Sequence, residues 1–309
     1  MAPPHDAVLL IAFGAPARME DVRPFLANVV RGRRVPPERI EEVVHHYARF
    51  DGHSPLTELT QRQARALEAD LASRGPAIPV YVGMRNWAPY LHETLARMRS
   101  EGVRRAVGIV MAPHRSYSSW DQYHENVAEA RARVGEGAPE VAYLRAWFDH
   151  PGFIEAQADR AAAALDLVPS EERSTTHMIF TAHSIPSAMA ANGPYVEQLT
   201  ASGRLVAARV SLPRWSVAYQ SRSGDPRTPW LGPDVNDVIR DLGPRGAGAA
   251  VVVPIGFVCD HIEVLYDLDV EARETADAAG LAFYRTGTVA EHPAFIRMLG
   301  DLVLAGAVA

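Results

Sequence analysis

The sequence predicts an α/β protein built from two similar doubly wound domains, each with a parallel sheet. Short apolar runs alternate with longer amphipathic stretches along the chain, and several runs are apolar almost throughout, as expected for strands buried on both faces of a parallel sheet. Four such runs precede about residue 148 and four follow it. We therefore expect domains over 1–147 and 148–309 that face each other across a cleft, with ligands bound beyond the carboxyl ends of the strands.

The predicted strands and helices alternate in chain order. Residues 56–74 illustrate the helices, since Leu59, Leu67 and Leu71 lie near one face and Gly75 follows as a typical C-cap. The last helix, to about residue 306, can pack back on the first domain. The predicted strands are 7–13, 78–84, 105–112, 140–147, 177–183, 215–221, 249–258 and 281–286, and the predicted helices are 56–74, 89–101, 119–134, 150–167, 194–210, 232–242 and 292–305.

Composition excludes several functional classes. The net charge of −6 argues against a nucleic-acid partner. All 31 Lys and Arg residues are arginine, so a Schiff-base or P-loop lysine is impossible, and no G-x-G-x-x-G motif suggests a dinucleotide. The single cysteine allows neither an internal disulfide nor an iron–sulfur cluster, which needs about four thiolates. No signal peptide and no transmembrane segment are evident, and we expect a soluble, cytoplasmic protein.

His183 and the acidic segment that begins at Asp260 are the strongest candidates for chemistry. His183 closes an apolar strand, where an imidazole can take a proton or bind a metal. The alternative is a histidine that only forms a hydrogen bond to a loop. The second segment follows the most apolar strand, and only Arg273 and a protonated His261 are expected to offset its acids. Those acids are Asp260, Glu263, Asp267, Asp269, Glu271 and Glu274.

Glu263, Asp267 and Glu271 recur every four residues. This spacing stacks them along one side of a helix over roughly 12 Å, and a π-type turn would align them better. Like charges at this spacing destabilise a helix by a few tenths of a kcal/mol, so stability does not explain them. Carboxylate oxygens suit a divalent metal that is passed stepwise, whereas the alternative is a solvated acidic helix face.

Three further segments carry candidate binding residues. Residues 219–226 and 229–235 include Trp230, which can wall an apolar pocket or belong to the core. The N-terminal arm has clustered arginines at 31–34, which can pair with ligand carboxylates or form a solvated turn. Residues 113–124 combine hydroxyls and aromatic rings, which suits a flat amphipathic ligand.

Six motifs lie along nearly the whole chain. They are AFGAP at 12–16, GHSP at 52–55, RNWAPY at 85–90, TAHSIP at 181–186, QSR at 220–222 with WLGP at 230–233, and PIGFVCDHIE at 254–263. Together they resemble the motifs of the ferrochelatases, the enzymes that insert ferrous iron into a porphyrin, and the last three motifs, in this order and at this spacing, are highly specific. The resemblance is strongest to the short bacterial enzymes that convert coproporphyrin III to coproheme, and it implies a chelatase-like fold.

The resemblance implies a role for each matching residue. His183 matches the active-site histidine of the family and Glu263 its partner carboxylate, so both are expected to act in catalysis and to bind the metal. Asp267 and Glu271 match an acidic row that leads away from the centre and binds metal. The porphyrin-binding positions are expected to be Phe13, Arg31, Ser54, Tyr123 and Trp230.

Two departures from the family pattern carry predictions. Phe13 stands where many bacterial relatives have a tyrosine whose oxygen binds the iron of the product, so we expect no protein oxygen ligand from this position. Relatives with an iron–sulfur cluster carry several cysteines, so we expect no cluster and no permanently bound cofactor. The chain ends at Ala309 without the extension that supports dimers in mitochondrial relatives, and we expect a monomer.

The sequence and the resemblance together predict a ferrochelatase of haem biosynthesis. Its substrates would be Fe(II), which enters along the acidic row or past residue 13, and a porphyrin, with coproporphyrin III favoured. A haem-pathway enzyme that transiently accepts the product is a possible partner. The alternatives are a protoporphyrin IX ferrochelatase, a chelatase that loads another metal into a related tetrapyrrole, or a non-catalytic porphyrin or haem carrier.

Overall fold

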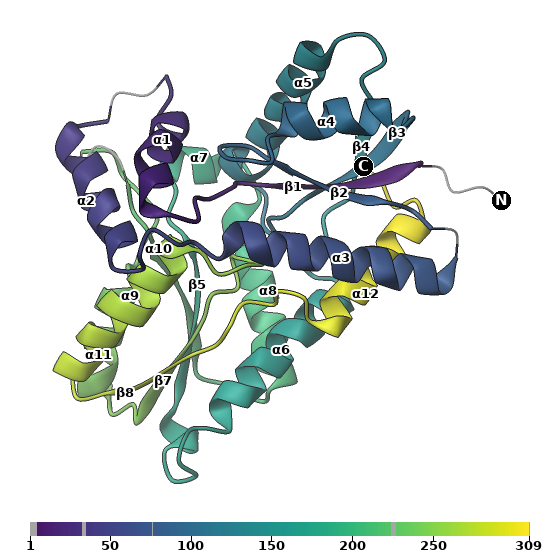
Figure 1. Ribbon diagram of the computed structural model, residues 1–309. Helices are drawn as coiled ribbons and strands as arrows, with labels where there is room; N and C mark the ends of the chain where they lie inside the picture. Colours follow the sequence, from purple (N-terminus) through teal and green to yellow (C-terminus); the bar gives the residue numbers. More distant parts are fainter. Residues whose placement is uncertain (1–4, 33–34, 76, 224–226, 309) are drawn as a thin grey trace. The chain divides into compact units, whose positions relative to one another are not determined.

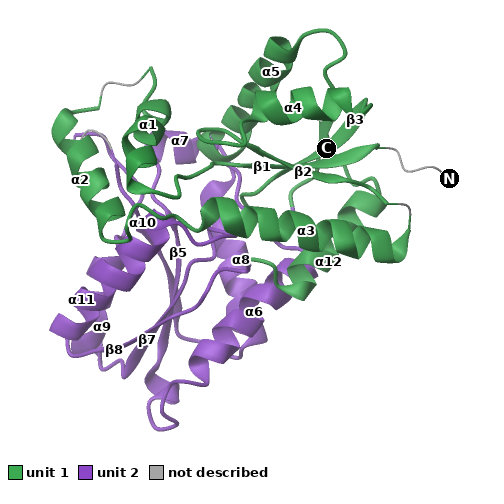
Figure 2. Cartoon of the chain, viewed as in Figure 1, with its two compact units in different colours: residues 1–112, 117–146, 290–309 green, residues 113–116, 147–289 purple. Residues whose placement is uncertain are grey.

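Two four-stranded parallel sheets organise the chain in the computed structural model, which describes residues 5–32, 35–75, 77–223 and 227–308 (Figure 1). Each sheet belongs to one of two units (Figure 2). Unit 1 contains residues 1–112, 117–146 and 290–309, and unit 2 contains residues 113–116 and 147–289. The fold class predicted from the sequence is therefore confirmed.

The sheet of unit 1 has the strand order β2-β1-β3-β4, with every pair parallel. All residues of β1 are buried, which requires cover on both faces, and this explains its continuous apolar sequence. After β1 the chain forms β2 on one side of β1, and then crosses to form β3 on the other side. A topological switch point therefore lies between β1 and β3. The strands are β1 (Ala7–Ala12), β2 (Val80–Met84), β3 (Arg105–Val110) and β4 (Glu140–Tyr143).

Helices cover this sheet in two groups. α4 and α5 pack together, and their residues Leu95, Met98 and Val127 share a core with Leu9 and Ile11 of β1. α3 packs against α12, which therefore belongs to unit 1 although it ends the chain. The helices are α1 (Met19–Val29), α2 (Pro37–Ala48), α3 (Leu56–Arg74), α4 (Leu91–Ser100), a π-helical turn η1 (Tyr117–Asp121), α5 (Gln122–Val134) and α12 (Pro293–Leu304).

The sheet of unit 2 repeats the same order as β6-β5-β7-β8, again with all pairs parallel. Each residue of β7 is buried, as expected for the most apolar run of the sequence. The equivalent switch point lies between β5 and β7. The strands are β5 (His177–His183), β6 (Trp215–Gln220), β7 (Ala249–Val253) and β8 (Ala282–Arg285).

Helices of unit 2 also form two groups. α6 packs against α8, while α9, η4 and α11 contribute to one core with residues of β5 and β7. The segment after β7 is thus part of the packed fold and not a free loop. The helices are α6 (Pro151–Leu165), η2 (Arg173–Thr175), α7 (Ser187–Ala191), α8 (Tyr195–Arg209), α9 (Val235–Leu242), η3 (Gly243–Arg245), α10 (Ile262–Val264), π-helical η4 (Leu265–Ala272) and α11 (Arg273–Ala278).

Several details differ from the predicted elements. α1 and α2 were not among the predicted helices, and Pro24 inside α1 interrupts the local helical pattern. The predicted helix 119–134 begins instead with a π turn. Pro233 and Asp234 precede α9, where the Asp234 carboxylate accepts a hydrogen bond from the Asn236 amide at 2.9 Å as an N-cap. No helix within the described residues is long and apolar enough to cross a membrane.

Candidate active site

His183 ends β5, the strand of unit 2 that borders its switch point. Its Nδ1 lies within hydrogen-bond distance of the Ser184 carbonyl oxygen, and a carbonyl can only accept, so Nδ1 carries the proton. The Tyr195 hydroxyl donates to the His183 carbonyl at 2.9 Å. The backbone and the ring are therefore both held, and Nε2 is left with its lone pair for chemistry.

Glu263 faces the free nitrogen of His183. Its Oε2 lies 3.8 Å from His183 Nε2, which is too long for a hydrogen bond. A first-row divalent metal such as zinc binds nitrogen and oxygen donors at about 2.1 Å, so one ion can be shared by both atoms at this separation. His183 is half-buried and Glu263 is exposed, so a ligand can reach the pair.

Gly256 brings the segment after β7 close to the end of β5. Its amide donates to the Thr181 carbonyl at 3.0 Å. A Cβ atom at this position would lie 2.5 Å from the Cβ of Ala182, a separation that forces one of the two backbones to move. Only glycine therefore permits this approach, which sets Glu263 opposite His183.

The acidic row formed by Glu263, Asp267 and Glu271 spans α10 and the π-helical η4. The wider π turn brings side chains four residues apart closer to a single line than an α-helix would. Glu263 and Glu271 are exposed, whereas Asp267 is only 8% exposed. Among the described residues no three His, Cys, Asp or Glu side chains gather as a metal cluster, so these carboxylates form a sequence of separate positions.

Asp267 is the buried member of the row, and its surroundings change its protonation. Its pKa is raised from 3.8 to about 7, with burial as the largest cause and the charges of Glu263 and Glu271 as further causes. Ser221 and Gln220 both donate hydrogen bonds to Oδ2, the latter at 3.2 Å, and oppose that shift. Asp267 can therefore hold or release a proton near neutral pH.

Arg285, at the end of β8, corrects the expectation that only Arg273 and His261 offset the acids. Its guanidinium binds Asp269 through Nε at 2.6 Å and Nη2 at 2.8 Å, and Asp260 through Nη1 at 3.0 Å. Arg273 is exposed and instead lies over the ring of Phe283, 5.0 Å from its centroid. Sequence reasoning missed Arg285 because it lies on a different strand, with no motif around it.

Trp230 is placed next to the loop of His183. Backbone pairing joins it to Pro186, and the Ser184 hydroxyl donates to the Leu231 carbonyl at 2.8 Å. The indole Nε1 is buried with no hydrogen-bond partner among the described residues. The neighbouring residues 224–226, part of the same candidate segment, lie outside the described residues.

Phe13 and Tyr123 lie in one patch of unit 1, joined by Arg85. The guanidinium carbon of Arg85 is 6.0 Å from the centroid of the Phe13 ring and 5.7 Å from that of Tyr123. The Phe13 ring is 37% exposed after β1, with its edge against Phe25. Burial raises the pKa of Tyr123 to about 12, so its phenol stays protonated at neutral pH.

Ser54 lies behind this first strand-end loop. It is 2% exposed, and its amide donates to the Pro16 carbonyl at 3.1 Å. Its hydroxyl is buried and has no hydrogen-bond partner in the described part of the chain. A buried hydroxyl without a partner costs free energy, so this oxygen is a candidate for contact with a ligand.

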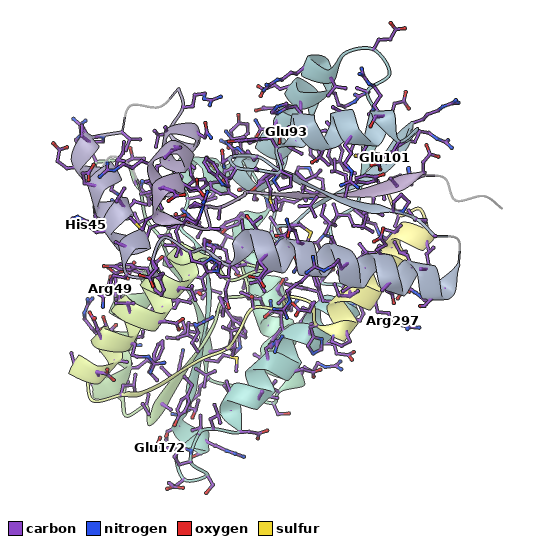
Figure 3. The ribbon with its side chains drawn as sticks, in the orientation of Figure 1. His45, Arg49, Glu93, Glu101, Glu172 and Arg297 are labelled. Atoms are coloured by element: carbon purple, nitrogen blue, oxygen red, sulfur yellow. The ribbon has the colours of Figure 1, made fainter. Side chains whose placement is uncertain are left out.

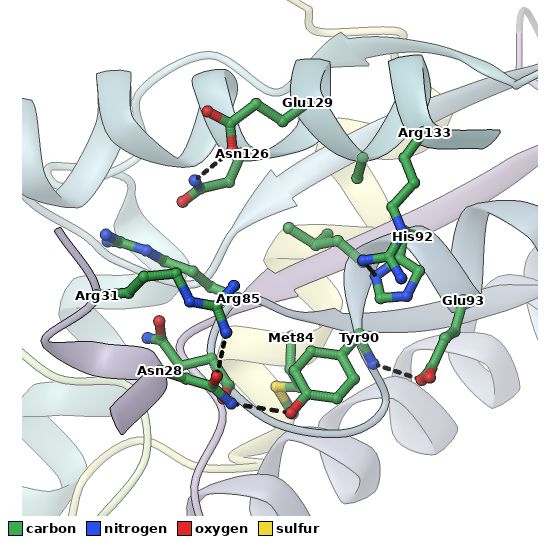
Figure 4. A pocket seen from close by; sticks show the side chains of 13 residues that line it. Asn28, Arg31, Met84, Arg85, Tyr90, His92, Glu93, Asn126, Glu129 and Arg133 are labelled. Atoms are coloured by element: carbon green, nitrogen blue, oxygen red, sulfur yellow. Dashed lines mark hydrogen bonds between the residues drawn. The ribbon is translucent and has the colours of Figure 1, made fainter. Parts of the chain in front are cut away.

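Arg31 follows α1 at the edge of a pocket of about 470 Å³ within unit 1 (Figure 4). Its guanidinium donates to the Asn28 side-chain oxygen, and Asn28 donates in turn to the Tyr90 hydroxyl at 3.0 Å. Arg133 lines the same pocket, 3.5 Å from His92 Nδ1. No described carboxylate pairs with Arg31 or Arg133. Arg33 and Arg34 of the expected cluster lie outside the described residues.

Other histidines of the candidate segments differ in their burial. On α2, His45 is exposed (Figure 3) and His46 is half-buried. His114, from the loop rich in hydroxyls, is 2% exposed and its Nε2 lies 3.0 Å from the Ser202 hydroxyl. Burial lowers its pKa to about 3, so it is a neutral packing residue.

Comparisons with known proteins identify the family of the chain. The sequence profile of the ferrochelatase family matches residues 5–307. A coproporphyrin III ferrochelatase of Mycolicibacterium vanbaalenii is 45% identical, over 96% of this chain and 89% of that protein. Another from Frankia alni is 48% identical over 96% and 79%, and a ferrochelatase of Rhodopirellula baltica is 43% identical over 97% and 86%.

A solved structure shares the fold. The sirohydrochlorin chelatase of Bacillus subtilis, in complex with cobalt, aligns over 98% of this chain and 94% of its own with a TM-score of 0.58 at 12% identity. At that identity the likeness concerns the architecture alone. The family match over nearly the whole length decides the classification: the chain belongs to the ferrochelatase family and is an enzyme that inserts a metal ion into a porphyrin.

Proposed function

We propose that this enzyme inserts Fe(II) into coproporphyrin III and so produces coproheme in haem biosynthesis. The observation that carries the proposal is the pair of His183 Nε2 and Glu263 Oε2, 3.8 Å apart at the carboxyl end of β5. The names of the relatives from Mycolicibacterium and Frankia favour coproporphyrin III over protoporphyrin IX.

The reaction requires the pyrrole nitrogens to lose protons as the metal enters. His183 Nε2 has the lone pair to accept a proton, because Nδ1 is committed to the Ser184 carbonyl. Glu263 stabilises the imidazolium that forms and passes the proton on. A bent macrocycle would expose the nitrogen lone pairs, and the binding energy of its carboxylates would sustain that strain.

Fe(II) is a substrate here, and we propose that it moves along the acidic row from Glu271 through Asp267 to Glu263. Hard carboxylate oxygens bind divalent ions, and separate positions favour transfer over retention. Asp267 must lose its proton to receive the ion. Its pKa of about 7 makes that loss easy near neutral pH. For the same reason Asp267 is partly protonated when no metal is bound, which reduces the repulsion between neighbouring carboxylates.

We propose that the porphyrin contacts the binding residues that the sequence predicts. Arg31 would bind a propionate, and its pocket with Arg133 has room for such a group. The hydroxyl of Ser54 would donate to another polar substituent. Phe13, Tyr123 and Trp230 would contact the apolar faces of the ring.

We also propose that the protein is a cytoplasmic monomer. It would have no resident cofactor, since the one cysteine cannot hold an iron–sulfur cluster. A haem-pathway enzyme would accept the product in a transient complex.

An anaerobic assay of the purified protein tests the proposal. Fe(II) is added with coproporphyrin III or, in parallel, protoporphyrin IX, and the loss of porphyrin fluorescence is followed. Faster metallation of coproporphyrin III is expected. Faster metallation of protoporphyrin IX would keep the chemistry and change the substrate. Binding of both rings without metallation by Fe(II), Co(II) or Zn(II) would indicate a carrier and contradict the proposal.

A further inference from the structure

Arg285 joins two parts of the chain that flank Glu263 and Asp267 in the sequence. Asp260 lies before α10, and Asp269 lies within η4. The side chain of Arg285 is 12% exposed and forms ion pairs with both carboxylates. It also donates to the Thr286 carbonyl at 3.1 Å, so every guanidinium nitrogen has a partner.

These contacts restrain the turn that carries Glu263 and Asp267. Both residues lie in sequence between Asp260 and Asp269, the two anchor points of Arg285. A π turn is less favourable than an α-helical one and persists where other contacts support it. The bidentate bond to Asp269 fixes the middle of η4, while the bond to Asp260 fixes the entry to α10. The planar guanidinium of arginine can bind one carboxylate through two nitrogens and a second carboxylate through the third, whereas the single ammonium group of lysine cannot.

The ion pairs also distinguish acids of this segment from one another. Asp260 and Asp269 are compensated by Arg285. Glu263 and Asp267 have no arginine within ion-pair distance among the described residues. These two acids therefore keep their capacity for a cation, while Asp260 and Asp269 do not compete for it.

We propose that Arg285 is a positioning residue for metal insertion: through Asp260 and Asp269 it holds α10 and η4 in the register that aligns Glu263, Asp267 and Glu271 for a divalent cation. The proposal rests on the function proposed above. It assigns to Arg285 an effect on the handling of Fe(II) and none on the binding of porphyrin.

A purely structural role is the competing explanation, since breaking a buried ion pair destabilises a protein in general. The two roles differ in what they change. A structural role lowers thermal stability and the fraction of folded enzyme, but the folded fraction keeps its KM for Fe(II). A positioning role changes that KM in folded protein.

Asp269→Asn is the decisive variant, because it keeps the shape of the side chain and leaves the bond between Arg285 and Asp260 intact. We expect the KM for Fe(II) to rise at least about tenfold, while the Kd for coproporphyrin III, measured by fluorescence, stays within about twofold. Arg285→Gln should show a larger rise and Arg285→Lys an intermediate one. Arg273→Gln is the matched control, because Arg273 is an exposed arginine of the same segment, outside this network, and should leave both constants unchanged.

Folded Asp269→Asn enzyme with an unchanged KM for Fe(II) would overturn the proposal, and so would an equal loss of porphyrin binding. Arg285→Gln enzyme that fails to fold leaves Asp269→Asn to decide. A failure of the proposed metal-insertion activity can be distinguished from these outcomes. In that case the wild-type protein would metallate neither porphyrin with any of the metals tried.

Discussion

The two sheets have the same strand order, yet the loops at their equivalent strand ends carry different chemistry. β1 and β5 hold the same place in their sheets; Phe13 follows the first, whereas His183 ends the second. β3 and β7 are also equivalent, and each is followed by a π-helical segment. The segment η1 carries hydroxyls and aromatic rings, while η4 carries acids.

This comparison separates what the fold contributes from what the side chains contribute. The switch point of a doubly wound sheet determines where a ligand can bind, and both units have one. The residues placed there determine the chemistry. Unit 2 contributes titratable groups, and unit 1 contributes aromatic rings and arginines. We therefore expect substitution of the titratable groups of unit 2 to affect turnover, and substitution of the arginines of unit 1 to affect porphyrin binding.

Substitution of the titratable pair of unit 2 should have the largest effect. His183→Ala or Glu263→Gln should lower kcat by about 100-fold or more, because each removes a proton acceptor of the reaction. The Kd for coproporphyrin III should change by less than about threefold. His177→Gln is the control, since His177 begins the same strand at its opposite end. Turnover close to that of wild type in both site variants would contradict the assignment.

Substitution in the pocket of unit 1 should have a smaller effect, and this effect should be on the KM for the porphyrin. Arg31→Ala removes a charge-assisted hydrogen bond to a propionate, so the KM for the porphyrin should rise about tenfold, or about 1.4 kcal/mol, with kcat little changed. Arg39→Ala serves as the control, because Arg39 is a half-buried arginine of α2 that pairs with Glu42. A drop in kcat with an unchanged KM for the porphyrin would contradict the prediction that Arg31 acts in porphyrin binding.

His114 follows β3 and is buried, and this burial should make the stability of the protein depend on pH. The pKa of His114 is about 3 in the folded protein and near 6.5 in the unfolded chain, so the unfolded chain binds more protons between these values. The free energy of unfolding should then fall by up to about 1.4 kcal/mol per pH unit as the pH drops from 6.5 toward 3. Chemical denaturation of His114→Gln should show a shallower slope than wild type. Equal slopes would show that His114 is not held neutral.

The smallest effect on turnover is expected at Phe13, where the readout is spectroscopic. Phenylalanine has no ligand atom, so resonance Raman spectra of the wild-type product complex should lack an iron–phenolate band. Phe13→Tyr should gain this band while kcat changes by less than about threefold. Phe13→Leu, which also lacks an oxygen, is the control. An iron–oxygen band that persists in Phe13→Leu would place the ligand elsewhere in the protein.

The sequence by itself determined the α/β class, all eight strands and the motifs that define the family. It could do so because these are local signals: apolar runs of strand length and residues adjacent in the chain. It also placed His183 at a strand end and predicted the spacing of Glu263, Asp267 and Glu271. The roles of these residues remain predictions, and α1 was missed because Pro24 interrupts its local pattern.

Only the tertiary structure decided which distant residues meet. It paired Arg285 with Asp260 and Asp269, enclosed Asp267 so that its pKa rises to about 7, and packed α12 against α3 in unit 1. Burial and charge pairing depend on neighbours from remote strands and helices, which a local pattern does not specify. For that reason the sequence could identify the acids, while the fold decided that Arg285 compensates Asp260 and Asp269.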